Sequence, residues 1–449
     1  RDLRMSRGLG DVYKRQLLGQ RQVPAEAYYG IETLRGKENF EITKRGICRQ
    51  MIKALAIVKK AAAKANVDAL NIDEKVGKAI MLACDEILNG RLHGQFVTDL
   101  IQGGAGTSMN MNANEVIANR ANELLGGKKG VYDFVHPNDH VNFGQSTNDV
   151  IQTAGKIAIV KQLKKLQVEL KKLYNAYLNK ATEFKDVIKM GRTHLQEALP
   201  LRLGQEFSAY ASALNRDMKR IDVAIEALLE VNMGATAIGT SLNANEKYRK
   251  KVIYYLNKFS GEQIKPAKDL IDATRNFDTF GQASSTLKLL ALNLSKTASD
   301  LRLMASSGSN GFSEITLPHV QPGSSIMPGK YNPVVPEMVN QVCFYVIGLD
   351  VTITKAIEAG QLELNVFGPI ILMSLFEQIT TLRRATRTFH NLAISGLIAN
   401  TTKYKTDNSI YLITALSPHL GHEEACNVCL LYTSPSPREM RRSRMPSSA

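Results

Sequence analysis

Apolar residues recur every three or four positions along a stretch of about thirty residues, and this repeat constrains the fold more than any other feature. The stripe consists of Ile157, Val160, Leu163, Leu166, Leu170, Leu173 and Tyr177. Spacings of three and four place these side chains on one face of an α-helix. At 1.5 Å per residue, the helix predicted from Asp149 onward is roughly 45 Å long.

The same pattern recurs in four further stretches, namely residues 207–229, 287–304, 338–357 and 372–397. Few prolines interrupt them and the links are short, so the sequence predicts an elongated bundle of five long helices. Several of these helices carry apolar residues on more than one face, and such helices must be covered. Because one bundle covers each helix on one side only, we expect bundles of different subunits to pack together.

Composition narrows the class of protein. The chain has 449 residues, with 44% hydrophobic and 22% charged, which is ordinary for a soluble globular protein. We find no apolar run near the ~20 residues of a membrane span, and no apolar segment of a secretory signal near the start. The five cysteines form no disulfide framework in a chain of this length, so we expect a cytoplasmic protein.

The net charge of +15 does not indicate a nucleic-acid-binding protein. Residues 1–16 and residues 430–449 each contribute +3. The second segment is rich in Ser, Pro and Arg without an apolar period, which is typical of a disordered tail. The remaining chain is modestly basic, with no Trp and no interleaved basic and aromatic residues. This distribution favours an enzyme with an anionic ligand, with no nucleic acid or membrane as partner.

Four polar segments interrupt the helical pattern: residues 103–112, 144–150, 190–200 and 323–332. The last, "GSSIMPGKYN", is almost a phosphate loop, but five residues separate its glycines and Tyr331 follows Lys330. The first, "GGAGTSMNMN", lacks both the dinucleotide-binding spacing and a preceding strand. Together the segments supply hydroxyls, amides, one His and one Lys. Such donors suit a small anion with several oxygens, for example a dicarboxylate.

We predict no metal site. His136 and His140 have a spacing that ligands can have, but they lie in a loop and no third ligand is evident. Cys426 and Cys429 have no partner pair.

Residues 323–332 match every fixed position of G-S-S-x-M-P-x-K-x-N, the mobile-loop motif of the aspartase/fumarase superfamily. Other segments resemble the aspartase family in particular, among them "AYYGIETLRG", "GGAGTSMNMNANEVIANRA", "FKDVIKMGRTHLQEALPLRLGQEF" and "EAGQLELNVFGP". Fumarases usually carry T-Q-S-N-M-N and K-Y-W-G-A-Q-T where this chain has "GTSMNMN" and "AYYGIET". The resemblance covers about residues 17–425.

The resemblance implies a mainly α, aspartase/fumarase-type three-domain fold around a bundle of five long helices. It further implies a homotetramer in which three chains build each active site. We expect the domains to be 17–148 (N-terminal, mixed helical), 149–397 (central bundle) and 398–428 (the start of a truncated C-terminal domain). Within the first domain, residues 21–48 are mixed, and pieces such as "AYYGIETLRG" have β-like composition. Residues 1–16 and 429–449 resemble nothing in the family.

The reaction implied is reversible deamination of L-aspartate to fumarate and ammonia, a carbon–nitrogen lyase activity. It uses no organic cofactor and no obligatory metal, although divalent cations activate some members. Two alternatives share the fold: a class II fumarase, and a non-catalytic protein of the lens-crystallin kind.

The resemblance also assigns roles to residues at matched positions. Ser324 is the base that takes the Cβ proton, and Lys330 stabilises its ionised form. The β-carboxylate would be held by Thr107, Ser146, Thr147 and Ser325. The α-carboxylate would be held by Thr193, Lys330 and Asn332, with Asn148 and His194 facing the amino group.

Simpler alternatives exist for two of these assignments. Ser146, Thr147 and Asn148 precede a long helix and have the residue types of N-caps. His194 has the alternative of capping the start of a helix, although the matched Thr193 beside it favours the site. Two residues depart from the family pattern: Tyr331 replaces a usual Val in the loop, and Ser241 replaces a usual Gly. Because Tyr331 lies in the predicted lid, we expect it to affect closure.

Overall fold

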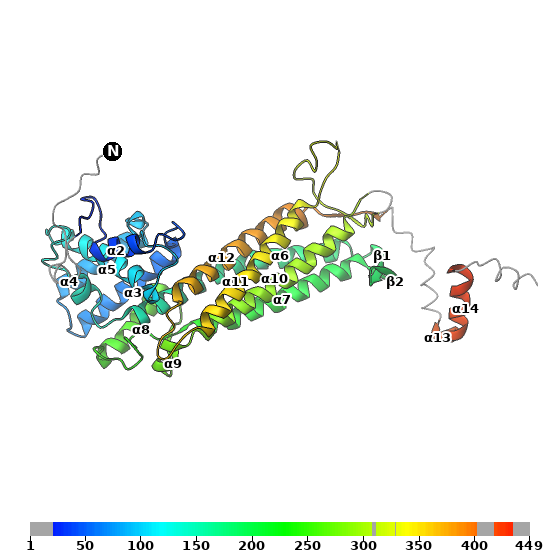
Figure 1. The fold of residues 1–449 in the computed structure, drawn as a ribbon. Helices are drawn as coiled ribbons and strands as arrows, with labels where there is room; N and C mark the ends of the chain where they lie inside the picture. The colour runs from blue at the N-terminus through cyan, green and yellow to red at the C-terminus, as the bar shows by residue number, and fades with distance from the viewer. Residues whose placement is uncertain (1–20, 308–310, 328, 402–416, 434–449) are drawn as a thin grey trace, which may run out of the picture. The chain divides into compact units, whose positions relative to one another are not determined.

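The computed structural model describes residues 21–307, 311–327, 329–401 and 417–433, and helices dominate it (Figure 1). The chain divides into two compact units. Unit 1 comprises residues 1–168, 217–291 and 342–383, and unit 2 comprises residues 169–216, 292–341 and 384–449. The division falls inside each of the long helices, so each unit contains a part of every one.

The five long helices predicted from the apolar pattern are confirmed. They are α6 (Thr147–Glu183), α7 (Leu203–Leu228), α10 (Asp278–Met304), α11 (Val334–Glu358) and α12 (Gly368–Phe389). The last is shorter than its pattern, because a π-helical turn, η4 (His390–Ile394), follows it. The apolar stripe of α6 is fully buried, as the spacing requires.

Buried polar contacts join the helices inside unit 1. Asp350 of α11 accepts a hydrogen bond from Ser284 Oγ at 2.7 Å and pairs with Lys288 Nζ at 2.6 Å, both on α10. Helix α6 approaches α12 at a glycine: a Cβ on Gly155 would lie 2.5 Å from a methyl carbon of Leu372. The absence of a side chain therefore permits this helix contact.

The first third of the chain forms a helical cluster in unit 1. Its helices are α2 (Ile31–Asn39), α3 (Arg49–Asp68), α4 (Glu74–Leu88) and α5 (Thr107–Leu124), with short turns η1 (His93–Gln95), η2 (Gly104–Gly106) and η3 (Pro137–Val141). Helix α3 packs against α4 and against α8 (Glu246–Ser260), and α5 packs against α2 and α4. Short helix α9 (Leu270–Arg275) and the two-residue parallel strands β3 (Glu230–Val231) and β4 (Lys265–Pro266) complete the unit.

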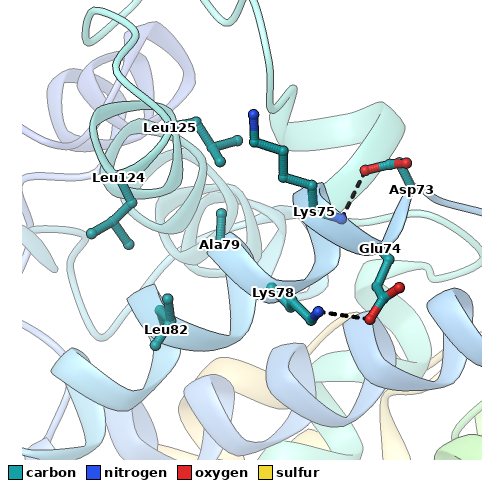
Figure 2. Close-up of a pocket in the computed structure, with 8 residues that line it drawn as sticks. All are labelled: Asp73, Glu74, Lys75, Lys78, Ala79, Leu82, Leu124 and Leu125. Atoms are coloured by element: carbon teal, nitrogen blue, oxygen red, sulfur yellow. Dashed lines mark hydrogen bonds and ion pairs between the residues drawn. The ribbon is translucent and has the colours of Figure 1, made fainter.

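Helix α4 shows how local sequence sets a helix start. The Asp73 carboxylate accepts hydrogen bonds from the backbone N–H groups of Lys75 and Val76, and Glu74 pairs with Lys78 one turn on (Figure 2). A surface cleft of about 440 Å³ lies beside them. None of the candidate site residues lines this cleft.

Helix α2 corrects a prediction. The segment "AYYGIETLRG" has β-like pieces, yet Ile31–Asn39 is helical. The distant Glu115 carboxylate, buried on α5, accepts hydrogen bonds from the backbone N–H groups of Gly30, Glu32 and Thr33 at 2.8–3.0 Å. It also accepts one from Thr33 Oγ1 at 2.6 Å. A side chain more than eighty positions away thus supplies the cap that the local sequence lacks.

We expect Glu115→Ala to lower the free energy of unfolding by about 3 kcal/mol or more, because it leaves several buried donors without an acceptor. Chemical denaturation followed by circular dichroism measures the change. Glu74→Ala removes an exposed carboxylate from α4 and should leave the midpoint nearly unchanged. Equal midpoints for the two variants would contradict the capping role of Glu115.

Unit 2 contains the ends of the long helices and two small sheets. Strands β1 (Ile188–Thr193) and β2 (Gln196–Arg202) form an antiparallel hairpin, and β5 (Ile315–Thr316) pairs with β6 (Ile398–Ala399). Tyr210 of α7 donates a hydrogen bond to Asp300 of α10 at 3.0 Å. Asn340 of α11 donates to the Ser295 carbonyl of α10 at 3.0 Å.

Helix α11 corrects a second expectation. By length and composition alone it is apolar enough to cross a membrane, although the sequence showed no run of that length. Its apolar character comes from two faces. One is buried and contains the paired Asp350, and the other exposes Phe344 and Val351.

The predicted ends lie largely outside the described residues. This is true of the whole N-terminal segment 1–16 and of residues 434–449. Two short helices, α13 (Ser417–Leu420) and α14 (His422–Thr433), directly precede residues 434–449. Residues 429–433 are therefore helical, whereas the composition of this tail indicated no regular structure.

Candidate active site

The first polar segment turns sharply into α5. The turn has three consecutive residues with left-handed backbone conformations: Gly104, Ala105 and Gly106, with φ of 77°, 58° and 95°. Two of the three are glycines, which adopt this conformation without steric cost. Thr107 then begins α5, and its hydroxyl donates to the Gly104 carbonyl at 2.7 Å. The turn places an exposed hydroxyl at a helix amino terminus, where carboxylates bind favourably.

The second polar segment begins α6. Ser146 Oγ accepts a hydrogen bond from the Asn148 backbone N–H at 3.3 Å, so the N-cap interpretation is correct for Ser146. Capping uses the oxygen as an acceptor, and the hydroxyl hydrogen can still be donated to a ligand. The Asn148 amide donates to the Ala237 carbonyl at 2.6 Å, which fixes its orientation.

The two segments meet within unit 1. A Cβ on Gly106 would lie 3.2 Å from the side chain of Ile151, one turn into α6. Asn110 of α5 donates to Thr147 Oγ1 at 3.4 Å and to Asn142 Oδ1 at 3.2 Å. The amino termini of α5 and α6 therefore lie close together, as the assignment to one carboxylate requires.

A fully buried lysine beneath this region was missed by the sequence analysis. Lys59 Nζ donates to Asn142 Oδ1 at 2.8 Å and to Gln145 Oε1 at 3.0 Å. Burial lowers the pKa of Lys59 to about 7. The sequence feature that could have indicated this buried lysine is its place in the apolar stripe of α3, four positions after Leu55.

Asp149 ties a second loop to the start of α6. Its carboxylate accepts hydrogen bonds from the backbone N–H groups of Ser146 at 2.9 Å and of Gly234 and Thr236 at 3.1 Å. Burial raises its pKa to about 6. A cleft of about 790 Å³ opens beside these loops. It is lined by Ser146, Thr147, Ala237 and nine other residues between positions 138 and 243, one of which is Asn142.

The third segment, which the sequence placed as a break in the helical pattern, is a β-hairpin. Thr193 ends β1, and His194 and Leu195 form the turn with φ of 56° and 62°. Two consecutive non-glycine residues in the left-handed region store strain, and strain of this kind concentrates at functional sites. The helix-capping alternative for His194 is wrong, because α7 begins only at Leu203.

The fourth segment holds Ser324 in a specific local geometry. Ser324 Oγ accepts hydrogen bonds from the backbone N–H groups of Ile326 at 3.3 Å and Met327 at 3.2 Å. Two donors aimed at a hydroxyl oxygen stabilise the ionised form and so favour loss of the proton.

The base of this loop is closed by hydrogen bonds. Gly323 N donates to the Lys330 carbonyl at 2.8 Å, and Asn332 Nδ2 donates to the Gly323 carbonyl at 2.8 Å. A side chain at Gly323 would collide with the Lys330 oxygen, 2.5 Å from its Cβ, so glycine is required there. Tyr331 stacks on His319, with ring centroids 3.7 Å apart and planes 5° apart. Tyr331, which replaces the usual Val of the family, therefore contacts His319 at the base of the loop.

The candidate residues are divided between the units. Thr107, Ser146, Thr147 and Asn148 belong to unit 1, and Thr193, His194, Ser324, Ser325, Lys330 and Asn332 belong to unit 2. Within the described ranges, no group of three or more His, Cys, Asp or Glu side chains has the arrangement of a metal site. His136 and His140 serve their own loop: the His136 backbone N–H donates to His140 Nδ1 at 2.8 Å.

The chain is similar to known proteins over most of its length. A family model described as lyase matches residues 19–348. Aspartate ammonia-lyase of Bacillus subtilis is 52% identical over 417 residues, which is 92% of this chain and 88% of the relative. The enzyme of the same name from Escherichia coli K12 is 48% identical, over 90% of this chain and 86% of the relative.

Solved structures have the same fold. A fumarate lyase/delta crystallin from Brucella melitensis, in a cobalt-bound crystal, superposes with a TM-score of 0.91 at 45% identity, over 96% of this chain and 95% of that one. A class II fumarase from Schistosoma mansoni superposes with a TM-score of 0.91 at 34% identity, over 95% and 92% of the two chains. The chain belongs to the aspartase/fumarase superfamily of lyases. Its curated relatives named here are all aspartate ammonia-lyases.

Proposed function

We propose that this protein catalyses the reversible deamination of L-aspartate to fumarate and ammonia. The proposal rests mainly on the geometry of Ser324, whose side-chain oxygen accepts hydrogen bonds from two backbone N–H groups inside the matched loop. The identity of 48–52% to aspartate ammonia-lyases over nine-tenths of the chain supports the choice of substrate.

In this mechanism Ser324 removes the Cβ proton. An ordinary serine hydroxyl is too weak a base, so its ionised form needs the two N–H donors and the nearby charge of Lys330. Proton removal leaves a carbanion whose charge spreads into the β-carboxylate. Donors already oriented toward that carboxylate lower the barrier most. Thr107, Ser146 and Thr147 provide hydroxyls for this purpose at two helix amino termini.

The remaining residues hold the other end of the substrate. Thr193, Lys330 and Asn332 bind the α-carboxylate, while Asn148 and His194 face the leaving amino group. Closure of the loop would exclude water, which protects the carbanion and disfavours addition of water to fumarate. The chemistry runs on side chains alone, with no organic cofactor or obligatory metal, and a divalent cation acts at most as an activator.

The assembly proposed is a cytoplasmic homotetramer in which three chains build each active site. One observation supports association of copies: α11 exposes large apolar side chains, with Phe344 62% and Val351 59% accessible in the single chain. Such a face in a long bundle helix fits burial against a second copy.

A pair of assays tests the function. Absorbance near 240 nm on addition of L-aspartate reports fumarate formation, and addition of L-malate tests for hydration chemistry. We expect fumarate from L-aspartate only. Fumarate from L-malate alone would select a class II fumarase, and inactivity toward both substrates in a folded protein would select a non-catalytic, crystallin-like role.

A further inference from the structure

Four charged side chains, none of them a candidate site residue, form a partly buried cluster in unit 2. Lys189 and Arg192 lie on β1, Glu206 lies on α7, and Glu314 immediately precedes β5. Their charges balance, with two cations and two carboxylates.

The contacts in the cluster are close. Lys189 Nζ lies 2.5 Å from Glu314 Oε2 and 3.1 Å from each carboxylate oxygen of Glu206. Arg192 pairs with the other Glu314 oxygen, Oε1. The side chains of Lys189 and Glu314 are each only 5% exposed. One carboxylate therefore binds two cations from the same strand.

The two cations flank an irregularity in β1. The pairing register with β2 shifts between Met190 and Arg192, so Lys189 precedes the bulge and Arg192 follows it. Arg192 is further fixed by its guanidinium, which lies 4.3 Å from the centroid of the Phe312 ring. A bulge redirects the residues that follow it, and those residues are Thr193 and His194.

The backbone of Glu314 is fixed by hydrogen bonds to two other segments. Its N–H donates to the Met304 carbonyl at the end of α10 at 2.8 Å, and its carbonyl accepts from Asn400 N at 3.0 Å. The Glu314 backbone is therefore tied to the end of α10 and to Asn400. Buried ion pairs add little stability compared with apolar residues of similar size, so stability alone gives no reason for the cluster.

We propose that Glu314 is a positioning residue, which sets the direction of the Thr193–His194 turn by holding Lys189 and Arg192 on either side of the β1 bulge. Glu314 does not touch the substrate; it acts through the turn. The inference rests on the proposed deamination, in which Thr193 and His194 contact aspartate. Small displacements of substrate-positioning groups have large effects on rate, up to about 100-fold for about 1 Å.

The test compares Glu314→Gln with a matched control. Glu262→Gln also neutralises a buried carboxylate that pairs with a lysine, Lys164, but it lies in unit 1 and outside the candidate site. We expect Glu314→Gln to lower kcat/KM for L-aspartate at least about tenfold and the control to leave it nearly unchanged. Arg192→Met, at a more exposed member of the cluster, should give the same direction of change and serves if Glu314→Gln folds poorly.

Two measurements separate positioning from general destabilisation. In a His194→Ala background, Glu314→Gln should lower kcat/KM by a smaller factor than it does in the wild-type protein, because one of the two groups that the turn presents has already been removed. Amide hydrogen exchange across residues 190–197 should be faster in Glu314→Gln and unchanged in the control. Full additivity in the double mutant, or unchanged exchange in the turn, would overturn the proposal. A wild-type protein without deaminase activity would refute the proposed function, and hydrogen exchange would still decide the role of Glu314.

Discussion

Ser324→Ala is expected to lower kcat for deamination of L-aspartate by at least about 100-fold, without loss of folded structure. The substitution removes the proposed base, and loss of a positioned base costs 10²–10⁴-fold in typical enzymes. The two N–H groups that donate to Ser324 Oγ belong to exposed residues, so water can replace the serine oxygen as their acceptor. The free energy of unfolding should therefore change little. Steady-state fumarate formation, with circular dichroism on the same sample, measures both effects.

Ser212→Ala is a matched control for this prediction. Ser212 lies on α7, and its hydroxyl donates a hydrogen bond to the Ser208 carbonyl one turn earlier at 3.0 Å. The control should retain full activity. If Ser324→Ala also retained near-normal turnover, another group would have to be the base.

Lys330→Met is expected to raise KM and to lower kcat together. In the closed loop the ammonium meets one carboxylate of a dianion in a site without water, and truncating such a charge pair costs about 2–5 kcal/mol. Part of this loss weakens ground-state binding and raises KM. The other part acts through Ser324, whose ionised form loses a neighbouring positive charge, and lowers kcat.

Lys330→Arg should restore neither constant, because a wide planar guanidinium replaces a compact ammonium in a tight turn. Lys247→Met, at an exposed lysine of α8, controls for the change in net charge. Measurement of kcat and KM for the three variants tests the prediction. Values of kcat and KM within about threefold of wild type for Lys330→Met would show that the loop is only structural.

Features that depend on neighbours in the chain were predicted correctly from the sequence. The stripe from Ile157 to Tyr177 is buried as its spacing required, and all five long helices are present. The loop motif that ends at Asn332 led to the family that the comparisons show. Helical periodicity and motif spacing are local properties, so a single sequence suffices to read them.

Two of the errors arose where a distant residue decided the local structure. Helix α2 looked β-like because its cap, Glu115, is on another helix. Lys59 looked like one lysine among many, because its partners Asn142 and Gln145 follow more than eighty positions later. No local pattern records such contacts.

The sequence by itself determined the five-helix scaffold, the superfamily and the candidate residues with their chemistry. Only the tertiary structure decided that Glu314 lies between Lys189 and Arg192, beside the strained hairpin turn that presents His194. The physical reason is the range of the interactions. A helix forms from contacts three and four residues apart, whereas Lys189 and Glu314 meet only after the chain has folded back through α7 and α10.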